Sequence, residues 1–412
     1  MIKFNAALKT ILDSVEIVES ESVRLTDALG RVLAEDIYAD SDIPGFDNSA
    51  MDGFAVKSSD TIGASQDNVK VLEVVEDIKA GDIARKILSH NQAMRIMTGA
   101  QIPKGADSVI MVEYTKKNQK SKFKIQNGTK EFVEIYKEVK AADNIRKKAE
   151  DIKKNELIIS KATQLNCAHI GILASLGRPR VKASRRPKIA LLATGDELVD
   201  VNQRLGPGKV RSSNTYTLYS QIIKCGCIPK NLGLAKDDPA QLEKKIRLGL
   251  DCDIILTSGG VSVGEYDLVK NVLAKIGTNI KFWQVAIRPG KPLVFGKIKK
   301  TLVFGLPGNP VSGMVSFEMF VRPAILKMSG QKEDNQKVVN AILEEDINKK
   351  KGARHFLRAK TRWKGNVYLT AISGPQGSSL LKPMSLANSL IILEEGQGPV
   401  KKGTRVRVRF LG

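Results

Sequence analysis

The sequence predicts a multidomain α/β and β protein with a central doubly wound α/β domain. At 412 residues the chain is longer than one ordinary core and suggests about two to four domains. Between residues 187 and 330, buried apolar strands alternate with amphipathic helices, which is the pattern of a parallel sheet covered on both faces. After residue 333, short alternating segments separated by turns predict a small C-terminal β domain at 333–412.

The first part of the chain divides around an inserted unit. Residues 1–43 have the pattern of two helices and a strand start, and residues 141–186 return to helical patterning. Residues 44–140 are rich in predicted strands, as in "AMRIMTGAQIPKGADSVIMVEY". We therefore predict one N-terminal domain formed by 1–43 and 141–186, with a β-rich domain inserted at 44–140.

The elements of the α/β domain at 187–330 follow in order. "KIALLATGDEL" predicts a buried strand, a turn and a helix, and a further helix covers about 213–225. Strands are then expected at "IPKNLGLA" and "DCDIILTSGG", with a helix at "AQLEKKIRLGL" between them, and later at "IKFWQVA", "PLVFGKI" and "TLVFGL". "PVSGMVSFEMFVRPAILKM" predicts a long closing helix. In such sheets ligands bind beyond the carboxyl ends of the strands, so the loops there are candidate site segments.

The C-terminal domain is predicted to consist of short strands. They are "FLRAKTRW", "NVYLTAI", "SLIILEE" and "TRVRVRF". The last one alternates arginine with apolar residues, which predicts an edge strand with one solvated face.

The composition excludes several function classes. The chain carries 66 basic and 44 acidic residues, a formal charge of +22, but aromatic residues make up only 5% and no nucleic-acid-binding module is present. Nucleic acid is therefore not an expected partner, although the charge favours encounter with polyanionic small molecules. No signal-peptide pattern and no apolar run of about 18–20 residues occurs, so a membrane partner is not expected. The four cysteines lack CxxC spacing, and we expect a cytoplasmic protein.

Three strand ends of the α/β domain carry pairs of acids. They are Asp196 and Glu197, Asp237 and Asp238, and Glu265 and Asp267. Helix capping explains one acid at each end, but not their recurrence at several ends of one sheet. The glycine-rich turn "TSGGVSVG" lies beside them and can direct backbone N–H groups toward an anion; its candidate residues are Ser258, Gly259, Gly260 and Ser262. A phosphate next to carboxylates suggests Mg²⁺, and no P-loop or GxGxxG motif is present.

Two further turns have the character of an oxyanion site. "IRPGKP" places Arg288 and Lys291 on a tight turn at a strand end. "GLPGNPVSG" places Pro307, Pro310 and Ser312 at the start of the long helix, whose first N–H groups are free. The three histidines lack nucleophile or metal spacing, so we expect metal-assisted and electrostatic catalysis.

"FDNSAMDGFAV", from Phe46 to Val56, holds four small polar residues within six positions. They are Asp47, Asn48, Ser49 and Asp52. Such side chains can cap neighbouring backbone groups, and they can equally be held against a ligand. Local chemistry leaves both interpretations open.

Seven motifs in order resemble one family. They are "FDNSAMDGFAV", "RIMTGAQIPKGAD", "NIRKKAEDI", "ATGDEL", "SGGVSVGEYD", "RPGKP" and "GLPGNPVS". Together they resemble the molybdopterin molybdenumtransferase family, called MoeA in bacteria and matched by the E domain of gephyrin, over essentially the whole chain. The resemblance implies a molybdopterin adenylyltransferase-like α/β domain that binds molybdopterin, and a linker and dimerisation role for the N-terminal domain. It also implies a homodimer in which each active cleft is shared between subunits.

The implied reaction uses adenylated molybdopterin and molybdate, with Mg²⁺ as cofactor. The adenylate is cleaved, the metal is inserted and AMP is released, and a molybdopterin adenylyltransferase is a further candidate partner. The resemblance implies catalytic roles for Asp52, Thr98, Glu197, Asp237 and Asp267, of which the last three would hold the metal. Pro307 and Pro310 fall on functional positions, and Lys291, Ser312 and Arg358 on residues that hold molybdate.

The chain departs from the family pattern at four positions. Ala149 and Asn155 stand where the family often has glycine, and Arg288 and Gln284 where lysine is usual. Two alternatives compete with the transferase: an adenylyltransferase, which a lone α/β domain would favour, and a basic scaffold that kept the fold and lost the chemistry. The matched acids argue against the scaffold. Molybdate and tungstate are both open as the oxyanion.

Overall fold

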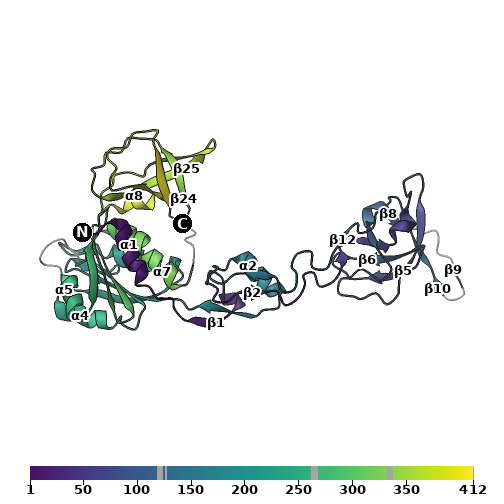
Figure 1. The fold of residues 1–412 in the computed structure, drawn as a ribbon, viewed down its shortest axis with the longest axis horizontal. Helices are drawn as coiled ribbons and strands as arrows, with labels where there is room; N and C mark the ends of the chain where they lie inside the picture. Colours follow the sequence, from purple (N-terminus) through teal and green to yellow (C-terminus); the bar gives the residue numbers. More distant parts are fainter. Residues whose placement is uncertain (118–123, 126–127, 261–267, 332–336, 412) are drawn as a thin grey trace. The chain divides into compact units, whose positions relative to one another are not determined.

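The computed structural model describes residues 1–117, 124–125, 128–260, 268–331 and 337–411. The chain forms two compact units (Figure 1). The larger comprises residues 1–35, 161–170 and 179–412, and the smaller comprises residues 36–160 and 171–178. Within the described residues, no helix is long and apolar enough to cross a membrane.

The α/β domain of the larger unit is built on a six-stranded sheet with the order β18-β15-β19-β23-β22-β20. Its strands are β15 (Lys188–Thr194), β18 (Ile228–Ala235), β19 (Ile254–Ser258), β20 (Asn279–Gln284), β22 (Pro292–Ile298) and β23 (Thr301–Leu306). The first four strands in the sheet order are parallel, as predicted, but β22 is antiparallel to both of its neighbours. The reason is local: only Lys299 and Lys300 connect β22 to β23, and so short a connection makes a hairpin.

Helices cover both faces of this sheet, which confirms the doubly wound prediction (Figure 1). Alternate residues of β15 point to opposite faces: Ile189 and Leu191 contribute to one core, and Ala190 and Leu192 to the other. The first core is closed by α1 (Phe4–Asp13), α3 (Ser213–Lys224) and the long helix formed by α6 (Pro310–Ser316), a π-helical segment (Phe317–Val321) and α7 (Arg322–Met328). The second core is closed by α4 (Pro239–Arg247) and α5 (Leu268–Lys275).

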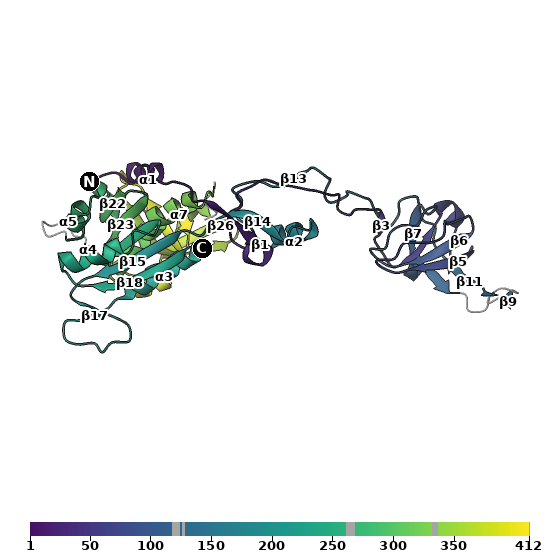
Figure 2. The same cartoon turned by 90° about the horizontal axis from the view of Figure 1, so that it is seen from below.

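The helix predicted after "ATG" is absent, and that prediction was wrong. Leu198–Val199 instead forms β16, which pairs in parallel with β17 (Val210–Arg211). Figure 2 shows the loop that carries β17 standing out from the domain. The segment between the two short strands is exposed and contains "GPG", so it has neither an apolar helical face nor an uninterrupted helical backbone.

The C-terminal sheet has the order β21-β25-β26-β24-β28-β27, and β25 also pairs with β27. The strands are β21 (Ile287–Arg288), β24 (Val338–Leu343), β25 (Arg354–Lys364), β26 (Val367–Ile372), β27 (Ser389–Leu393) and β28 (Arg405–Phe410); a short helix, α8 (Leu381–Ser385), precedes β27. β28 does have one wet face, but it lies between β24 and β27. The edge-strand prediction was therefore wrong. The alternation of arginine and apolar residues indicates that one face of the strand is solvated, but it does not indicate whether the strand has a neighbour on each side.

Helical patterning at the N-terminus was also over-predicted. Only α1 forms within residues 1–43; the next segment makes β1 (Ser20–Arg24), which pairs with β14 (Arg180–Ser184), and a 3₁₀ turn at Leu25–Asp27. Among residues 141–186, α2 (Cys167–Ser175) is the helix that the structure contains. The strand conformation of β1 depends on pairing with β14, which is far away in the sequence. Local periodicity does not indicate such a partner.

The smaller unit contains a six-stranded sheet with the order β7-β4-β6-β5-β11-β8. These strands are β4 (Gly53–Val56), β5 (Lys70–Ile78), β6 (Gln92–Ile96), β7 (Ser108–Met111), β8 (Thr115–Lys117) and β11 (Glu131–Ile135). Short pairs join β2 (Ile37–Tyr38) to β13 (Leu157–Ile159), β3 (Asn48–Ser49) to β12 (Ile145–Arg146), and β9 (Lys124–Ile125) to β10 (Gly128–Thr129). 3₁₀ turns lie at Ser58–Thr61 and Val112–Tyr114. β3 and β4 position the loop that contains Asp52.

The two positions where the family often has glycine keep a glycine-like backbone in this chain. Ala149 has φ +61° and Asn155 has φ +69°. The left-handed region costs alanine about 1–2 kcal/mol, whereas asparagine tolerates it better. Substitution has therefore left strain at Ala149.

Ala149→Gly should raise the free energy of unfolding by about 0.5–1 kcal/mol, because relief of the strain exceeds the greater entropy of unfolded glycine. Urea unfolding of the wild type and of Ala149→Gly measures this difference in the free energy of unfolding. Asn155→Gly is the matched control and should change stability less. A destabilised Ala149→Gly variant would contradict this account.

Candidate functional site

A pocket of about 660 Å³ lies at the carboxyl ends of β15 and β19 in the α/β domain. Its walls come from the loops that follow these strands, from the start of α3 and from the start of α6. Six of the residues predicted from the sequence line it: Glu197, Asp237, Ser258, Gly259, Gly260 and Pro310. The strand-end location agrees with the rule for ligand binding in open α/β sheets.

The structure separates the roles of the neighbouring acids Asp237 and Asp238. Asp238 is the N-cap of α4 and accepts hydrogen bonds from the backbone N–H groups of Ala240 at 2.8 Å and Gln241 at 3.4 Å. Asp237 lines the pocket, where its Oδ1 accepts a hydrogen bond from Thr194 Oγ1 at 3.0 Å. Asp237 is therefore available to a ligand, whereas Asp238 stabilises a helix.

The sequence reasoning missed Asn214, which is buried in the pocket wall at the start of α3. Its Nδ2 donates to Ser258 Oγ and to the Gly308 carbonyl oxygen, both at 2.8 Å. Both donors of the amide are thus used, while its buried Oδ1 has no hydrogen-bond partner within the described residues. The signal that could have found it is the polar run "RSSN" at the start of an amphipathic helix.

The glycine-rich turn after β19 approaches the neighbouring strand end closely. Gly259 has φ +95°, and a Cβ added there would lie 2.2 Å from the Thr194 carbonyl oxygen. Any side chain would force these strand ends apart, so glycine is required at this position. Ser262 and Asp267, which continue the predicted site, lie outside the described residues.

The "RPGKP" turn packs on the first turns of the long closing helix. Gly290 has φ +104°, and a Cβ there would lie 2.6 Å from Ser316 Oγ and 3.6 Å from the Ser312 carbonyl oxygen. Arg288 and Lys291 are exposed on either side of this contact, whereas Ser312 is buried. The turn thus brings two cationic residues to the segment that follows Pro307 and Pro310, although Arg288, Lys291, Pro307 and Ser312 do not line the 660 Å³ pocket.

Arg358 is fully buried in β25 and lacks a counter-charge within the described residues. Its Nη2 donates to the Pro375 carbonyl oxygen at 2.8 Å, while its Nε and Nη1 have no hydrogen-bond partner in the part of the chain that the structure describes. Burial lowers the pKa of the guanidinium. A buried cation without a compensating charge is unfavourable, which is typical of a site that receives an anion.

A short segment connects Arg358 to the strand-end pocket. Gln376 Oε1 accepts a hydrogen bond from the Arg358 backbone N–H at 2.9 Å. Two residues later, the Ser378 carbonyl oxygen accepts a hydrogen bond from the Val311 N–H at 3.0 Å, and Ser379 lines the pocket. The C-terminal β domain therefore closes one side of the site.

In the smaller unit, Asp52 and Thr98 lie together. Asp52 Oδ1 accepts hydrogen bonds from the Thr98 backbone N–H and from Thr98 Oγ1, both at 2.7 Å. These two bonds hold the pKa of the Asp52 carboxyl below its usual value, with the backbone bond as the larger cause. Asp47 instead accepts from the Lys148 backbone N–H at 2.7 Å and pairs with Lys147 at 3.1 Å, which is a structural role.

Thr98→Val should raise the pKa of Asp52, because it removes the hydroxyl donor. A carboxyl group whose pKa is lowered by folding stabilises the protein above its unfolded pKa, and that contribution is lost as the pH falls through the folded pKa. The variant should therefore have a smaller contribution, whose loss is complete at a higher pH than in the wild type. Carboxyl carbon NMR titration measures the pKa directly, and Thr98→Ser, which keeps the hydroxyl, is the control. An unchanged pKa in Thr98→Val would contradict the hydrogen-bond explanation.

The pocket contains oxygen donors that suit Mg²⁺. Glu197 and Asp237 provide carboxylates, and Asn214 provides an amide oxygen that has no hydrogen-bond partner among the described residues. Mg²⁺ usually takes one or two carboxylates together with water and substrate phosphate, so this donor set fits the ion. Within the described residues no group of three or more histidine, cysteine or acidic side chains could hold a metal, and Asp267, the third predicted ligand, lies outside them.

Comparison with known families covers nearly the whole chain. Residues 2–177 match the MoeA N-terminal region (domain I and II), residues 190–327 match a probable molybdopterin binding domain, and residues 340–411 match the MoeA C-terminal region (domain IV). The chain is 37% identical over 394 residues to the molybdopterin molybdenumtransferase of Bacillus subtilis (strain 168), covering 95% of this chain and 90% of the relative. The chain belongs to the MoeA family.

Other MoeA relatives agree with this assignment. The molybdopterin molybdenumtransferase of Haemophilus influenzae is 37% identical over 413 residues, which is 99% of this chain and 98% of that protein. The crystal structure of the molybdopterin biosynthesis MoeA protein from Pyrococcus horikoshii OT3 covers 100% of both chains with a TM-score of 0.82 at 30% identity. The family and the fold class expected from the sequence motifs are therefore confirmed.

Proposed function

We propose that this protein is a molybdopterin molybdenumtransferase, which uses adenylated molybdopterin and molybdate and releases AMP. The observation that carries the proposal is the strand-end pocket, which Glu197, Asp237 and the Gly259–Gly260 turn line together. This pocket lies in the domain that matches a probable molybdopterin binding domain. The full-length relatives in Bacillus subtilis and Haemophilus influenzae are named for the same activity.

The pocket side chains would position the adenylated substrate. Asn214 Oδ1 can accept a hydrogen bond from a substrate N–H or O–H, because both amide donors of Asn214 already hold the pocket wall. The Gly259–Gly260 turn allows the substrate phosphates to approach the backbone closely, since no side chain stands in the way. The two carboxylates would orient the reacting group.

We infer that Mg²⁺ is the cofactor, with Glu197, Asp237 and Asp267 as its protein ligands. When bound, the ion would neutralise phosphate charge and polarise the phosphoanhydride. The support is the donor set of the pocket, in which two of these carboxylates lie with the free Asn214 amide oxygen.

Molybdate would bind beside the pocket, near the "RPGKP" turn. Arg288, Lys291 and Arg358 supply positive charge there, and the buried Ser312 lies in the first turn of α6. Cations and helix N-terminal N–H groups together favour a doubly charged oxyanion. Arg288 keeps the charge of the usual lysine but presents a planar fork of donors, so it changes geometry more than charge.

We further propose a homodimer in which Asp52 and Thr98 of one subunit complete the cleft of the other. The support is chemical: Asp52 is an exposed carboxylate oriented by two hydrogen bonds, and no ion pair is recorded for it among the described residues. A molybdopterin adenylyltransferase would supply the substrate. None of the four cysteines forms a disulfide, which is usual in a reducing compartment, and we infer that the protein acts in the cytoplasm.

Mixed dimers test the shared cleft. Asp52→Ala and Asp237→Asn should each be inactive alone, while mixed dimers of the two subunits should recover about half of the wild-type rate, since one of the two clefts is intact in every mixed dimer. AMP release from separately tagged, doubly purified dimers measures the recovery. Verified mixed dimers without any recovery would contradict the shared cleft.

AMP release tests the proposed function itself. The purified protein should release AMP from adenylated molybdopterin and Mg²⁺ in the presence of molybdate, and a parallel reaction with tungstate determines the oxyanion preference. A reaction with molybdopterin and ATP tests the adenylyltransferase alternative and should yield no adenylate. Binding of the adenylate without turnover under both oxyanions would contradict the transferase and favour a scaffold.

A further inference from the structure

A second pocket, of about 410 Å³, lies at the opposite end of the α/β domain from the candidate site. β15 begins beside it, after Arg185, Arg186 and Pro187, and ends at Thr194 in the candidate site. α3 begins at the candidate site and ends at this pocket with Lys224 and Cys225. The two pockets thus lie at opposite ends of β15 and of α3. We call the second one the cationic pocket.

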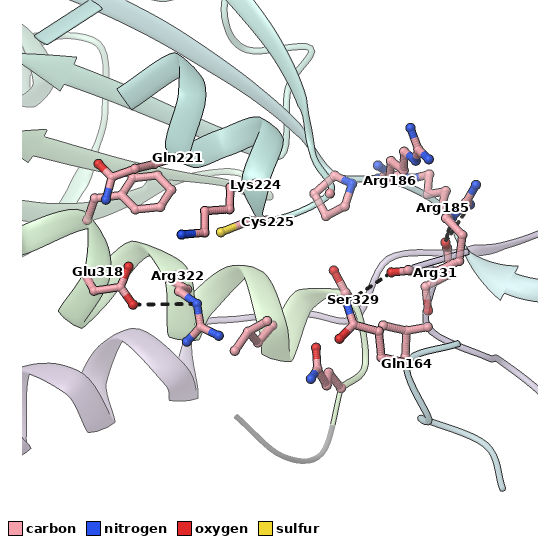
Figure 3. Close-up of a pocket in the computed structure, with 18 of the residues that line it drawn as sticks. Arg31, Gln164, Arg185, Arg186, Gln221, Lys224, Cys225, Glu318, Arg322 and Ser329 are labelled. Atoms are coloured by element: carbon pink, nitrogen blue, oxygen red, sulfur yellow. Dashed lines mark hydrogen bonds and ion pairs between the residues drawn. The ribbon is translucent and has the colours of Figure 1, made fainter. Parts of the chain in front are cut away.

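Basic side chains dominate the lining of the cationic pocket. They are Arg31, Arg185, Arg186, Lys224, Arg322 and Lys337, against the single acid Glu318. Figure 3 shows Lys224 and Cys225 projecting from α3 toward the helix that carries Glu318 and Arg322, with Arg31, Arg185 and Arg186 at the other end. Val32, Pro187, Phe317, Leu326 and Phe410 add apolar surface.

Part of this basic set forms a fixed framework. Arg185 donates to both oxygens of Asp253 at 2.6 and 2.7 Å and to Glu19 at 2.8 Å. Arg31 pairs with Glu21 and donates to the Ser184 carbonyl oxygen at 2.8 and 3.3 Å. These arginines are already neutralised, so they shape the pocket more than they attract a ligand.

Arg186 and Lys224 form no ion pair or side-chain hydrogen bond with any residue that the structure describes. A third polar group is also incompletely bonded. Gln221 Nε2 donates to the Met314 carbonyl oxygen at 3.3 Å, while its buried Oε1 lacks a donor among the described residues. Among the described residues, the pocket therefore offers two positive charges without an ion-pair partner, an amide oxygen acceptor and apolar walls.

We propose that the cationic pocket binds a small organic anion, an apolar or aromatic body that carries a phosphate or carboxylate group. Arg186 and Lys224, at the two ends of the pocket, each present a positive charge to an anionic group, and Val32, Phe317 and Phe410 match the body. The volume is within the range of small-molecule sites. Either cation attracts a dianionic phosphate more strongly than a carboxylate, because the phosphate carries the larger charge. The proposal does not depend on the transferase reaction.

Calorimetric titration with three small probes tests the ligand class. Phenyl phosphate and benzoate represent the two anionic groups on one aromatic body, and phenol represents the same body without charge. The phosphate should bind more tightly than benzoate, and phenol should not bind measurably. The ratio of the two anion affinities identifies the anionic group. Failure of both anions to bind at about 10 mM, a concentration that reveals millimolar affinity, would overturn the proposal.

Charge-removing variants locate the binding. Arg186→Gln and Lys224→Gln should each weaken phenyl phosphate binding about three- to tenfold, and the double variant should weaken it further. Lys281→Gln removes an equally exposed lysine from β20 and is the matched control, which should leave binding unchanged. Asp237→Asn alters the candidate site and should also leave it unchanged. Loss of binding in either control, or full binding in the double variant, would overturn the location.

Cys225 gives a readout without substitution, because it lines the pocket, is partly exposed and forms no disulfide. Saturating phenyl phosphate should slow alkylation of Cys225 by N-ethylmaleimide at least about threefold, as measured by peptide mass spectrometry, because a bound ligand covers the pocket wall. Cys167, an exposed thiol on α2, is the internal control and should react at the same rate with and without ligand. Equal effects on both thiols, or none on Cys225, would overturn the proposal.

Discussion

Asp237→Asn should lower the rate of AMP release by about a hundred- to a thousandfold while leaving the protein folded. The substitution removes a carboxylate charge from the strand-end pocket, and a lost electrostatic group at a reacting centre costs about this much. Asparagine keeps an oxygen that can accept the hydrogen bond from Thr194 Oγ1, so the free energy of unfolding should change by less than about 1 kcal/mol. Steady-state AMP release and urea unfolding measure the two quantities.

The neighbouring acid provides the matched control. Asp238→Ala removes the N-cap of α4 and should lower the free energy of unfolding by about 1 kcal/mol with little effect on the rate. Substitution of Asp237 should therefore lower activity with little effect on stability, whereas substitution of Asp238 should lower stability with little effect on activity. A fully active Asp237→Asn protein, or an inactive and stable Asp238→Ala protein, would contradict the assignment of roles.

Arg358→Met should raise the molybdate concentration needed for half-maximal AMP release by at least about tenfold, because a charged hydrogen-bonding partner of the oxyanion is lost. Most substitutions of a buried residue destabilise the protein, whereas this one should not. Arg358 is fully buried with one recorded side-chain hydrogen bond among the described residues, so replacing it with an apolar side chain of similar length should leave the protein equally or more stable.

Molybdate titrations and thermal unfolding without molybdate test this pair of effects. Arg362→Met is the control: Arg362 lies on the same strand but is exposed and pairs with Glu344 at 2.8 Å. Arg362→Met should leave the molybdate dependence unchanged. It should change the free energy of unfolding by no more than the contribution of one surface ion pair. Destabilisation of Arg358→Met by several kcal/mol with an unchanged molybdate dependence would assign Arg358 a structural role.

Local sequence patterns were sufficient to locate several helices and strands that have a clear apolar period. α3, α4, β18, β19 and the four named C-terminal strands all occur where apolar periodicity placed them. Three of the failures have a related cause. β1, β16 and the interior position of β28 depend on distant or short pairings, which no local period reports.

The candidate site shows a similar division. Motifs identified Asp237 and Asp238 together, but only the cap geometry of α4 shows which acid faces the pocket. Asn214 was missed because an asparagine near a helix start is ordinary until its neighbours Ser258 and Gly308 are known. Arg358 was named from resemblance alone. Its burial without a counter-charge among the described residues is the physical reason to expect an anion there.

The most direct test of the central claim is the amount of molybdenum on the pterin for each AMP released in a single turnover. Adenylated molybdopterin, molybdate and Mg²⁺ are mixed with excess enzyme, and both products are quantified after rapid separation. The account predicts one molybdenum atom for each AMP, with neither product formed by Asp237→Asn. AMP release without molybdenum on the pterin would contradict it, since the protein would then cleave the adenylate without inserting the metal.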